Sequence, residues 1–86
     1  MPRYFFNVYD GVSAIDHDGT EFENLAAAKL EALQLIGEIL RHHSKSIANG
    51  EDWHLEVVDK HALILFRVDL LVTDAPVARS DKPTKR

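Results

Sequence analysis

The sequence predicts an α+β domain in which one long helix packs against an antiparallel sheet of three to four strands. Residues 3–9 are aromatic and β-branched, which is typical of a strand. Residues 24–47 are rich in alanine and leucine and place apolar residues at helical spacing. Residues 53–59 and 62–72 predict two further strands joined at Lys60-His61, so the expected order is strand, short hairpin or loop, helix, strand, strand.

The first strand is expected to turn one face toward the core and to end at the Asp10-Gly11 turn signal. Successive side chains of a strand point to opposite faces. We assign to the core the face without a strongly polar member, which carries Tyr4, Phe6 and Val8. The opposite face carries Phe5, Asn7 and Tyr9.

The segment 12–23 holds too few apolar residues for a helix. Its Asp18-Gly19 pair is a strong two-residue hairpin signal. We therefore expect a short, ragged pair of strands around this turn.

The predicted helix has recognisable signals at both ends. Asn24 is a good N-cap because its side-chain oxygen can accept a hydrogen bond from an amide of the first turn. Asn49-Gly50 supplies the left-handed residue that ends a helix. At 100° per residue, one stripe is polar and consists of Glu31, Gln34, Glu38 and Arg41. The opposite arc is apolar and consists of Leu25, Ala28, Ala32, Leu33, Ile36, Ile39 and Leu40.

Leu30 and Leu35 fall on the two flanks of this apolar arc, which makes it wider than one sheet face usually covers. We expect another surface to cover the flanks. The run 62–66 is apolar on both sides, as expected of a central strand or of an edge strand covered by a neighbouring subunit. Trp53 is expected to cap the core beneath the end of the helix.

The chain has 86 residues, so it holds one domain at most, which we place at residues 1–75. Residues 76–86 are polar, carry prolines and predict a disordered basic tail. Four basic residues against one acidic residue give this tail a charge of +3. Because the net charge of the whole chain is −4, the other 75 residues together carry −7. An acidic body repels phosphate backbones, and we do not expect it to bind nucleic acid.

Several classes of protein are disfavoured by composition. The chain has no cysteine, which excludes disulfides, thiolate metal sites and a cysteine nucleophile. No signal peptide and no membrane-spanning run is recognisable, so we expect a cytoplasmic protein. There is no nucleophile elbow and no glycine-rich phosphate loop, and so small a domain has little room for a substrate pocket. We expect no enzyme activity, no catalytic residue and no cofactor.

The histidines and the acidic loop are the remaining candidates for a metal site. Side chains of His42 and His43 point about 100° apart on a helix and cannot ligate one ion together. A metal protein or enzyme using these residues or His17 is the least favoured hypothesis. The stretch Asp16–Glu21 fails the calcium-loop pattern because its glycine is fourth and position twelve is Ala27. We therefore predict no metal ligand.

Exposed apolar residues point instead to an interface. Phe5 and Tyr9 lie opposite the predicted core face, and if they are exposed beside Leu63 and Leu65 they form a patch that a monomer rarely leaves bare. The candidate interface residues are Phe5, Tyr9, Leu30, Leu35, Leu63 and Leu65. The leading hypothesis is a non-catalytic interaction module that self-associates as a homodimer, through the second sheet face or the edge of the strand at 62–70.

The chain also resembles a family of short bacterial proteins that contain a domain of unknown function. The resemblance lies in Met1–Phe6, the Asp10-Gly11 turn, the Asp16–Phe22 stretch that leads into an alanine-rich helix, and the strand pair between Trp53 and Phe66. It covers about residues 1–70 and implies no activity. Similar sequences often begin the helix with Asp-Leu-Glu-Ala-Ala, which is replaced here by an uncharged turn starting at Asn24.

A weaker, architectural similarity is to the small HicB-type antitoxin domain, which binds a toxin partner. It supports a second hypothesis, an antitoxin-like or regulatory protein whose basic tail contacts nucleic acid or an acidic partner. Because a fold does not determine a function, this hypothesis ranks below self-association.

Overall fold

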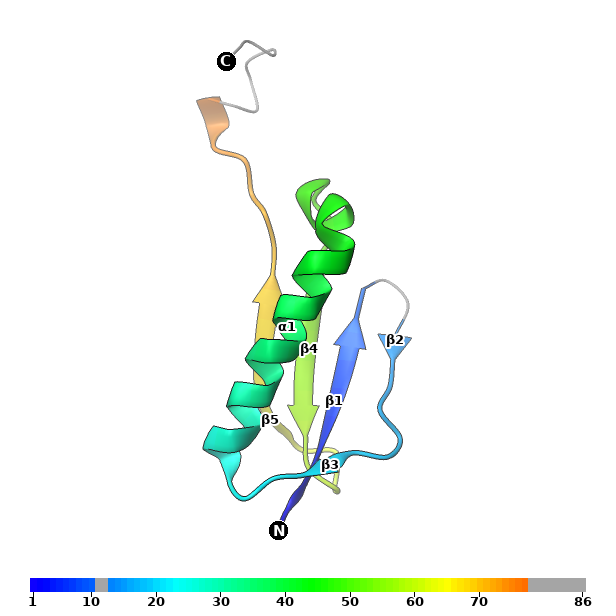
Figure 1. Cartoon of the computed structure of the whole chain (residues 1–86). Helices are drawn as coiled ribbons and strands as arrows, with labels where there is room; N and C mark the ends of the chain where they lie inside the picture. The colour runs from blue at the N-terminus through cyan, green and yellow to red at the C-terminus, as the bar shows by residue number, and fades with distance from the viewer. Residues whose placement is uncertain (11–12, 78–86) are drawn as a thin grey trace.

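The computed structural model describes residues 1–10 and 13–77, in which one helix lies across one face of a sheet (Figure 1). The elements follow the predicted order and are β1 (Arg3–Tyr9), β2 (Ser13–Ala14), β3 (Thr20–Glu21), α1 (Leu25–Ala48), β4 (Trp53–Val58) and β5 (Ile64–Leu70). The α+β prediction is confirmed. Of the tail predicted at 76–86, residues 78–86 lie outside the described part of the chain.

The sheet is antiparallel, with the strand order β2-β1-β4-β5 and with β3 also pairing with β1. The strand predicted at residues 62–72 is shorter than expected and is observed as β5. It begins only at Ile64, because Ala62 adopts a left-handed backbone with φ +66°, and it ends at Leu70. Leu70 pairs with Trp53, the first residue of β4, so β4 offers no partner to the residues that follow.

The predicted hairpin around Asp18-Gly19 is wrong in its pairing. Two short strands do form, but β2 pairs with the end of β1 at Val8 and Tyr9, while β3 pairs with its start at Arg3 and Tyr4. The cause is the Asp16 carboxylate, which accepts hydrogen bonds from the backbone N–H groups of Phe6 at 3.2 Å, Asp18 at 3.1 Å and Gly19 at 3.0 Å. The bond from Phe6 holds the loop against β1, and the bonds from Asp18 and Gly19 close a turn within the loop, so β2 and β3 pair with β1 and not with each other.

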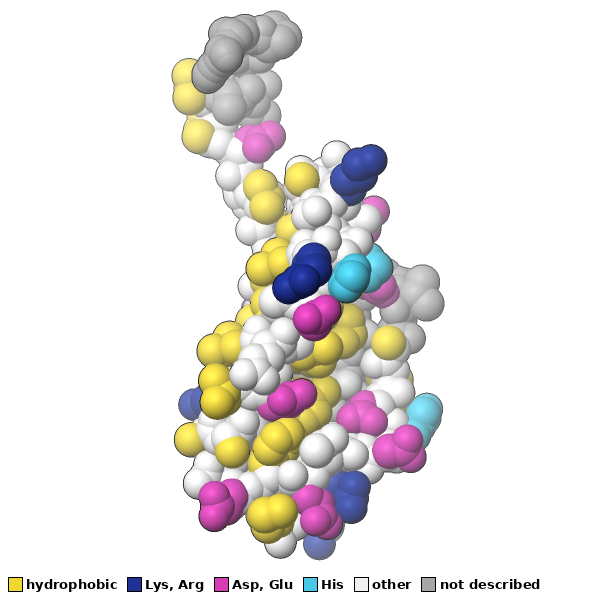
Figure 2. Space-filling view, viewed as in Figure 1, with side chains coloured by type: hydrophobic (Ala, Val, Ile, Leu, Met, Phe, Trp, Pro, Cys, Tyr) yellow, Lys and Arg dark blue, Asp and Glu magenta, His cyan; other side chains and the backbone are white. Residues whose placement is uncertain are grey.

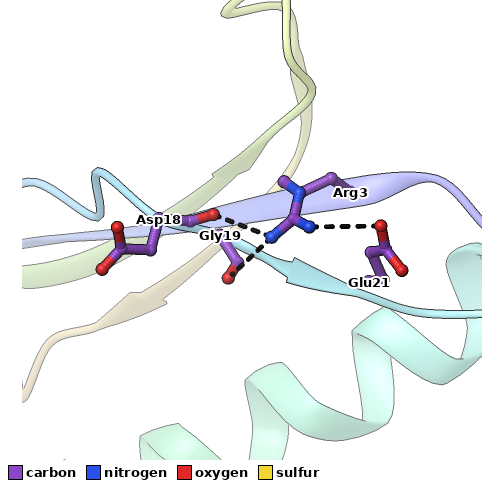
Figure 3. Close-up of polar contacts among 4 residues, drawn as sticks. All are labelled: Arg3, Asp18, Gly19 and Glu21. Carbon is purple, nitrogen blue, oxygen red and sulfur yellow. Dashed lines mark hydrogen bonds and ion pairs between the residues drawn. The ribbon is translucent and has the colours of Figure 1, made fainter.

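Arg3 and Gly19 complete this attachment (Figure 3). The Arg3 guanidinium donates to the carbonyl of Asp18 at 3.0 Å and forms an ion pair with Glu21 at 3.1 Å. Gly19 has φ +71°, and a Cβ there would lie 2.8 Å from both Arg3 Cγ and a carbon of the Phe5 ring. Glycine is required at this position by both its backbone conformation and its close packing.

The helix begins and ends where the sequence predicts. The Asn24 side chain accepts from the N–H of Ala27 at 2.9 Å, and Gly50 follows the last turn with φ +94°. The helix is kinked at His43, whose ring packs on Trp53 with 4.6 Å between ring centroids. Trp53 is 5% exposed, which confirms its predicted place beneath the end of the helix.

The core lies between α1 and the sheet. It consists of Tyr4, Ala28, Ala32, Ile36, Ile39, Ile47, Trp53, Leu55 and Val57, with Phe6 and Val8 packed against it. The predicted core face of β1 is therefore confirmed. Ala28 and Ala32 are fully buried, since their small side chains let the helix backbone approach the sheet closely.

Three residues assigned to the core arc are not buried, and Leu25, the first residue of the helix, is 38% exposed. Leu33 is 59% exposed and Leu40 is 43% exposed, because the buried stripe of α1 is centred on Ala32 and Ile36 and leaves one flank beyond the sheet contact. No helix in the described part of the chain has the length and apolar character that a membrane span needs.

Candidate interaction surface

Strand β5 forms an unshared edge of the sheet. The outer edge of β1 is occupied by β2 and β3, and β4 lies between β1 and β5. Among the described strands, β5 pairs with β4 alone, through six of its residues, and a bulge leaves Leu65 outside the register. Every second residue of such an edge turns its N–H and C=O groups outward, where another strand can pair with them.

The helix flank beside this edge is apolar. Leu30, Leu33 and Leu40 are 60%, 59% and 43% exposed and follow one another along one side of α1. Lys29, on the same side, reaches to 6.0 Å from the centre of the Phe66 ring, which places this flank over β5. Figure 2 shows hydrophobic side chains along the margin of the helix on the side where Figure 1 draws β5.

Apolar side chains also lie at both ends of β5. Ile64 is 54% exposed at its start, and Leu71 and Val72 are 60% and 49% exposed just past its end. We call the combination of Leu30, Leu33 and Leu40 with residues 64–72 the β5 surface. Apolar groups this close together are unusual on the surface of a monomer and mark sites of association.

The face of the sheet opposite α1 is polar along β4 and β5. Arg67 donates to Asp69 at 2.9 Å and lies 3.7 Å from Glu56 on β4. His54 lies 3.6 Å from Glu56, and its ring stacks on Tyr9 with 4.8 Å between ring centroids. Arg67 therefore lies between the carboxylates of Glu56 and Asp69, and this face is polar and charged.

The predicted interface residues do not form one patch. Leu30, Leu63 and Leu65 belong to the side of β5, where Leu30 and Leu63 are 60% and 62% exposed and Leu65 is half-buried against the core. Leu35 is half-buried against the core. Phe5 and Tyr9 are half-buried on β1, with β4 between them and β5.

The sequence reasoning missed Leu33 and Leu40, which it placed in the core, and Ile64, Leu71 and Val72, which it did not single out. Leu71 and Val72 continue an apolar run past Leu70, the last β5 residue with a β4 partner, so their exposure follows from the strand register.

One group of side chains in the described residues has the spacing of a metal site. Ligand atoms of Asp52, His54 and Asp69 lie within 4.8 Å of one another. Asp69 is already paired with Arg67, however, and both aspartates are exposed. The group does not include His17, His42 or His43; His42 lies instead 3.4 Å from Glu38.

Two carboxylates of the acidic loop, those of Asp16 and Glu21, form contacts within the fold. Burial raises the pKa of Asp16, but hydrogen bonds from the N–H groups of Gly19, Phe6 and Asp18 outweigh it and lower the pKa below its ordinary value. Glu21 is paired with Arg3. The carboxylates of Asp16 and Glu21 therefore hold the loop on β1, whereas Asp18 is exposed.

A hollow of about 360 Å³ lies beside the start of β1 and is larger than the size of the domain led us to expect. It is lined by Met1, Pro2, Arg3, Asp59, Lys60 and His61. The carboxylate of Asp59 accepts from the N–H groups of Leu63 at 3.0 Å and His61 at 2.8 Å, which lower its pKa. Asp59 thus stays ionised and cannot serve as a general acid near neutral pH.

Comparison with known proteins identifies the family. Searches of the curated proteins and of the solved structures find no match. A family model described as a domain of unknown function, DUF6894, matches residues 3–71, which include every strand and the helix. The chain therefore belongs to the DUF6894 family.

Proposed function

We propose that this protein is a non-catalytic interaction module that self-associates into a homodimer through the β5 surface. The observation that carries the proposal is the combination of an unshared strand edge with an exposed row of leucines on the helix beside it. Strand addition satisfies the outward backbone groups, and the leucines supply the apolar area that backbone pairing alone lacks.

The size of the apolar contribution sets the expected affinity. Burying one leucine fully contributes about 1.5–3 kcal/mol, so completing the burial of three half-exposed leucines on each of two subunits contributes about 6 kcal/mol. The cost of association is about 4–15 kcal/mol. The leucines alone offset only the low end of this cost, and a micromolar dissociation constant requires a net gain of about 8 kcal/mol, so backbone pairing must supply most of the stability of the dimer.

The face opposite α1 was the other candidate for self-association, and it is less suited. Its β1 half is partly covered by the loop that Asp16 holds, where Asn7 is 7% exposed and accepts from the N–H of Asp16. Its β4 and β5 half carries Arg67 in ion pairs with Glu56 and Asp69. Burying such pairs costs desolvation that their mutual attraction often does not repay.

Sedimentation velocity over a range of micromolar concentrations tests the proposal. We expect the native chain to shift from monomer to dimer, and Leu33→Glu to remain monomeric at the same concentrations. The matched control is Gln34→Glu, which adds the same charge to the next residue, on the exposed polar stripe. A monomer at all concentrations, or equal effects of the two variants, would contradict the proposal.

A further inference from the structure

We infer that the two copies pair their β5 strands antiparallel about a two-fold axis at Val68, so that Arg67 of each chain faces Asp69 of the partner subunit. The inference rests on the self-association proposed above and adds its register.

The sides of β5 restrict the possible registers. Phe66, Val68 and Leu70 pair with the buried β4 residues Val57, Leu55 and Trp53 and so face the helix. Arg67 and Asp69 face the opposite side. Residues directly opposite each other in an antiparallel pair share a face, and a shift by one residue moves every side chain to the other face. An axis that passes through a residue therefore keeps both helices on one side of the joined sheet.

Only that arrangement lets the leucine rows meet. With both helices on one side, Leu30, Leu33 and Leu40 of one chain face the same row of its partner across the β5 junction. A register that sets odd-numbered residues opposite even-numbered ones would put the second helix on the opposite side and leave these leucines exposed, and no two-fold axis relates its two strands.

Charge then selects among the axes near the middle of the strand. An axis at Arg67 places two arginines opposite each other, and an axis at Asp69 places two aspartates opposite each other. Like charges in directly opposed positions are destabilising. The axis at Val68 instead creates two Arg67–Asp69 pairs and sets Phe66 opposite Leu70 of the partner subunit.

The same register accounts for the exposed residues at the ends of β5. It brings Leu71 and Val72, which have no β4 partner, to the start of the partner strand. Leu65 and Ile64 lie there, and Ile64 is 54% exposed. The joined strands would thus extend beyond Leu70, the last residue that pairs within one chain.

In the single chain, Arg67 and Asp69 pair with each other while their side chains remain 47% and 54% exposed. Such an exposed pair contributes little to stability, so exchanging it for pairs between the chains costs little.

Charge reversal tests the register. Arg67→Asp leaves two aspartates and Asp69→Arg leaves two arginines on each strand, so each variant alone faces only like charges at these positions. We expect each to dimerise at least roughly 10-fold more weakly than the native chain, since two attractive pairs become two repulsive ones. Mixed in equal amounts, the two variants should form a heterodimer of near-native affinity, which sedimentation with one labelled chain detects.

The outcomes separate this inference from the proposal beneath it. An axis at Arg67 predicts no loss with Asp69→Arg, and an axis at Asp69 predicts no loss with Arg67→Asp, so either result would overturn the Val68 register while the dimer stands. Absence of a native dimer would overturn both. Rescue by mixing shows that Arg67→Asp is folded beside Glu56, because a chain that does not fold cannot be rescued in this way, so its loss of dimer when alone reports on the register.

Discussion

Replacing Asp16 by alanine should lower the stability of the fold more than any other single carboxylate change in the acidic loop. The variant removes an acceptor for three backbone N–H groups, those of Phe6, Asp18 and Gly19. A hydrogen bond to a charged group contributes about 1.5–3 kcal/mol when buried. Because this site is partly exposed and water can replace some of the bonds, we expect a loss of about 2–4 kcal/mol in total.

The asparagine variant refines the test. One Asp16 oxygen accepts from both Asp18 and Gly19, and the other accepts from Phe6. An amide keeps the first oxygen but places an N–H₂ group against the N–H of Phe6. We therefore expect Asp16→Asn to cost about half as much as Asp16→Ala.

The pH dependence has a definite sign. The pKa of Asp16 is lower in the folded chain than in the unfolded chain, so its contribution to stability is present above the unfolded pKa. The contribution is lost as the pH falls through the folded pKa, from a starting point near the ordinary aspartate value of about 3.9. The gap in stability between the native chain and Asp16→Ala should shrink over that range.

Urea unfolding followed by circular dichroism at neutral pH and at successive acidic values measures both effects. Asp18→Ala is the matched control, since Asp18 is an exposed carboxylate in the same loop. Equal stability of Asp16→Ala and Asp18→Ala at neutral pH would refute the reasoning. So would a gap between Asp16→Ala and the native chain that does not change with acid.

Three further predictions concern glycine, capping and the tail. In thermal unfolding, Gly19→Ala should lower the stability of the fold by about 1–3 kcal/mol, because this position has a positive φ and no room for a Cβ. Gly37→Ala lies in open helical surroundings and should raise the stability by about 0.5–1 kcal/mol. A change of stability with the same sign in both variants would contradict this prediction. Asn24→Ala should lower the free energy of unfolding by about 1 kcal/mol, and Asn24→Asp by much less, since the aspartate keeps the oxygen that caps the helix. Equal losses of stability for the two variants in urea unfolding would argue against the cap. Ending the chain after Ala75 should leave dimerisation in sedimentation unchanged, whereas the antitoxin-like hypothesis predicts that it abolishes binding to nucleic acid or an acidic partner.

The extents of the elements follow from local chemistry. Strand β1 coincides with its prediction, and α1 differs by about one residue at its end, since Asn24 and Gly50 mark its limits by hydrogen bonding and backbone freedom. The buried face of β1 follows from alternation because only one of its faces lacks a strongly polar residue. These features depend on neighbours within a few positions, which a single sequence displays in full.

The pairing partners and the uncovered surfaces depend on contacts between distant residues. Asp16 binds the backbone of Phe6, ten positions away, and thereby directs β2 and β3 to β1 instead of to each other. The strand order makes β5 the edge, and the orientation of α1 leaves Leu33 and Leu40 exposed beside it. Periodicity shows that a helix has an apolar arc, but it cannot show which part of the arc the sheet covers, because that depends on where the helix axis lies over the strands.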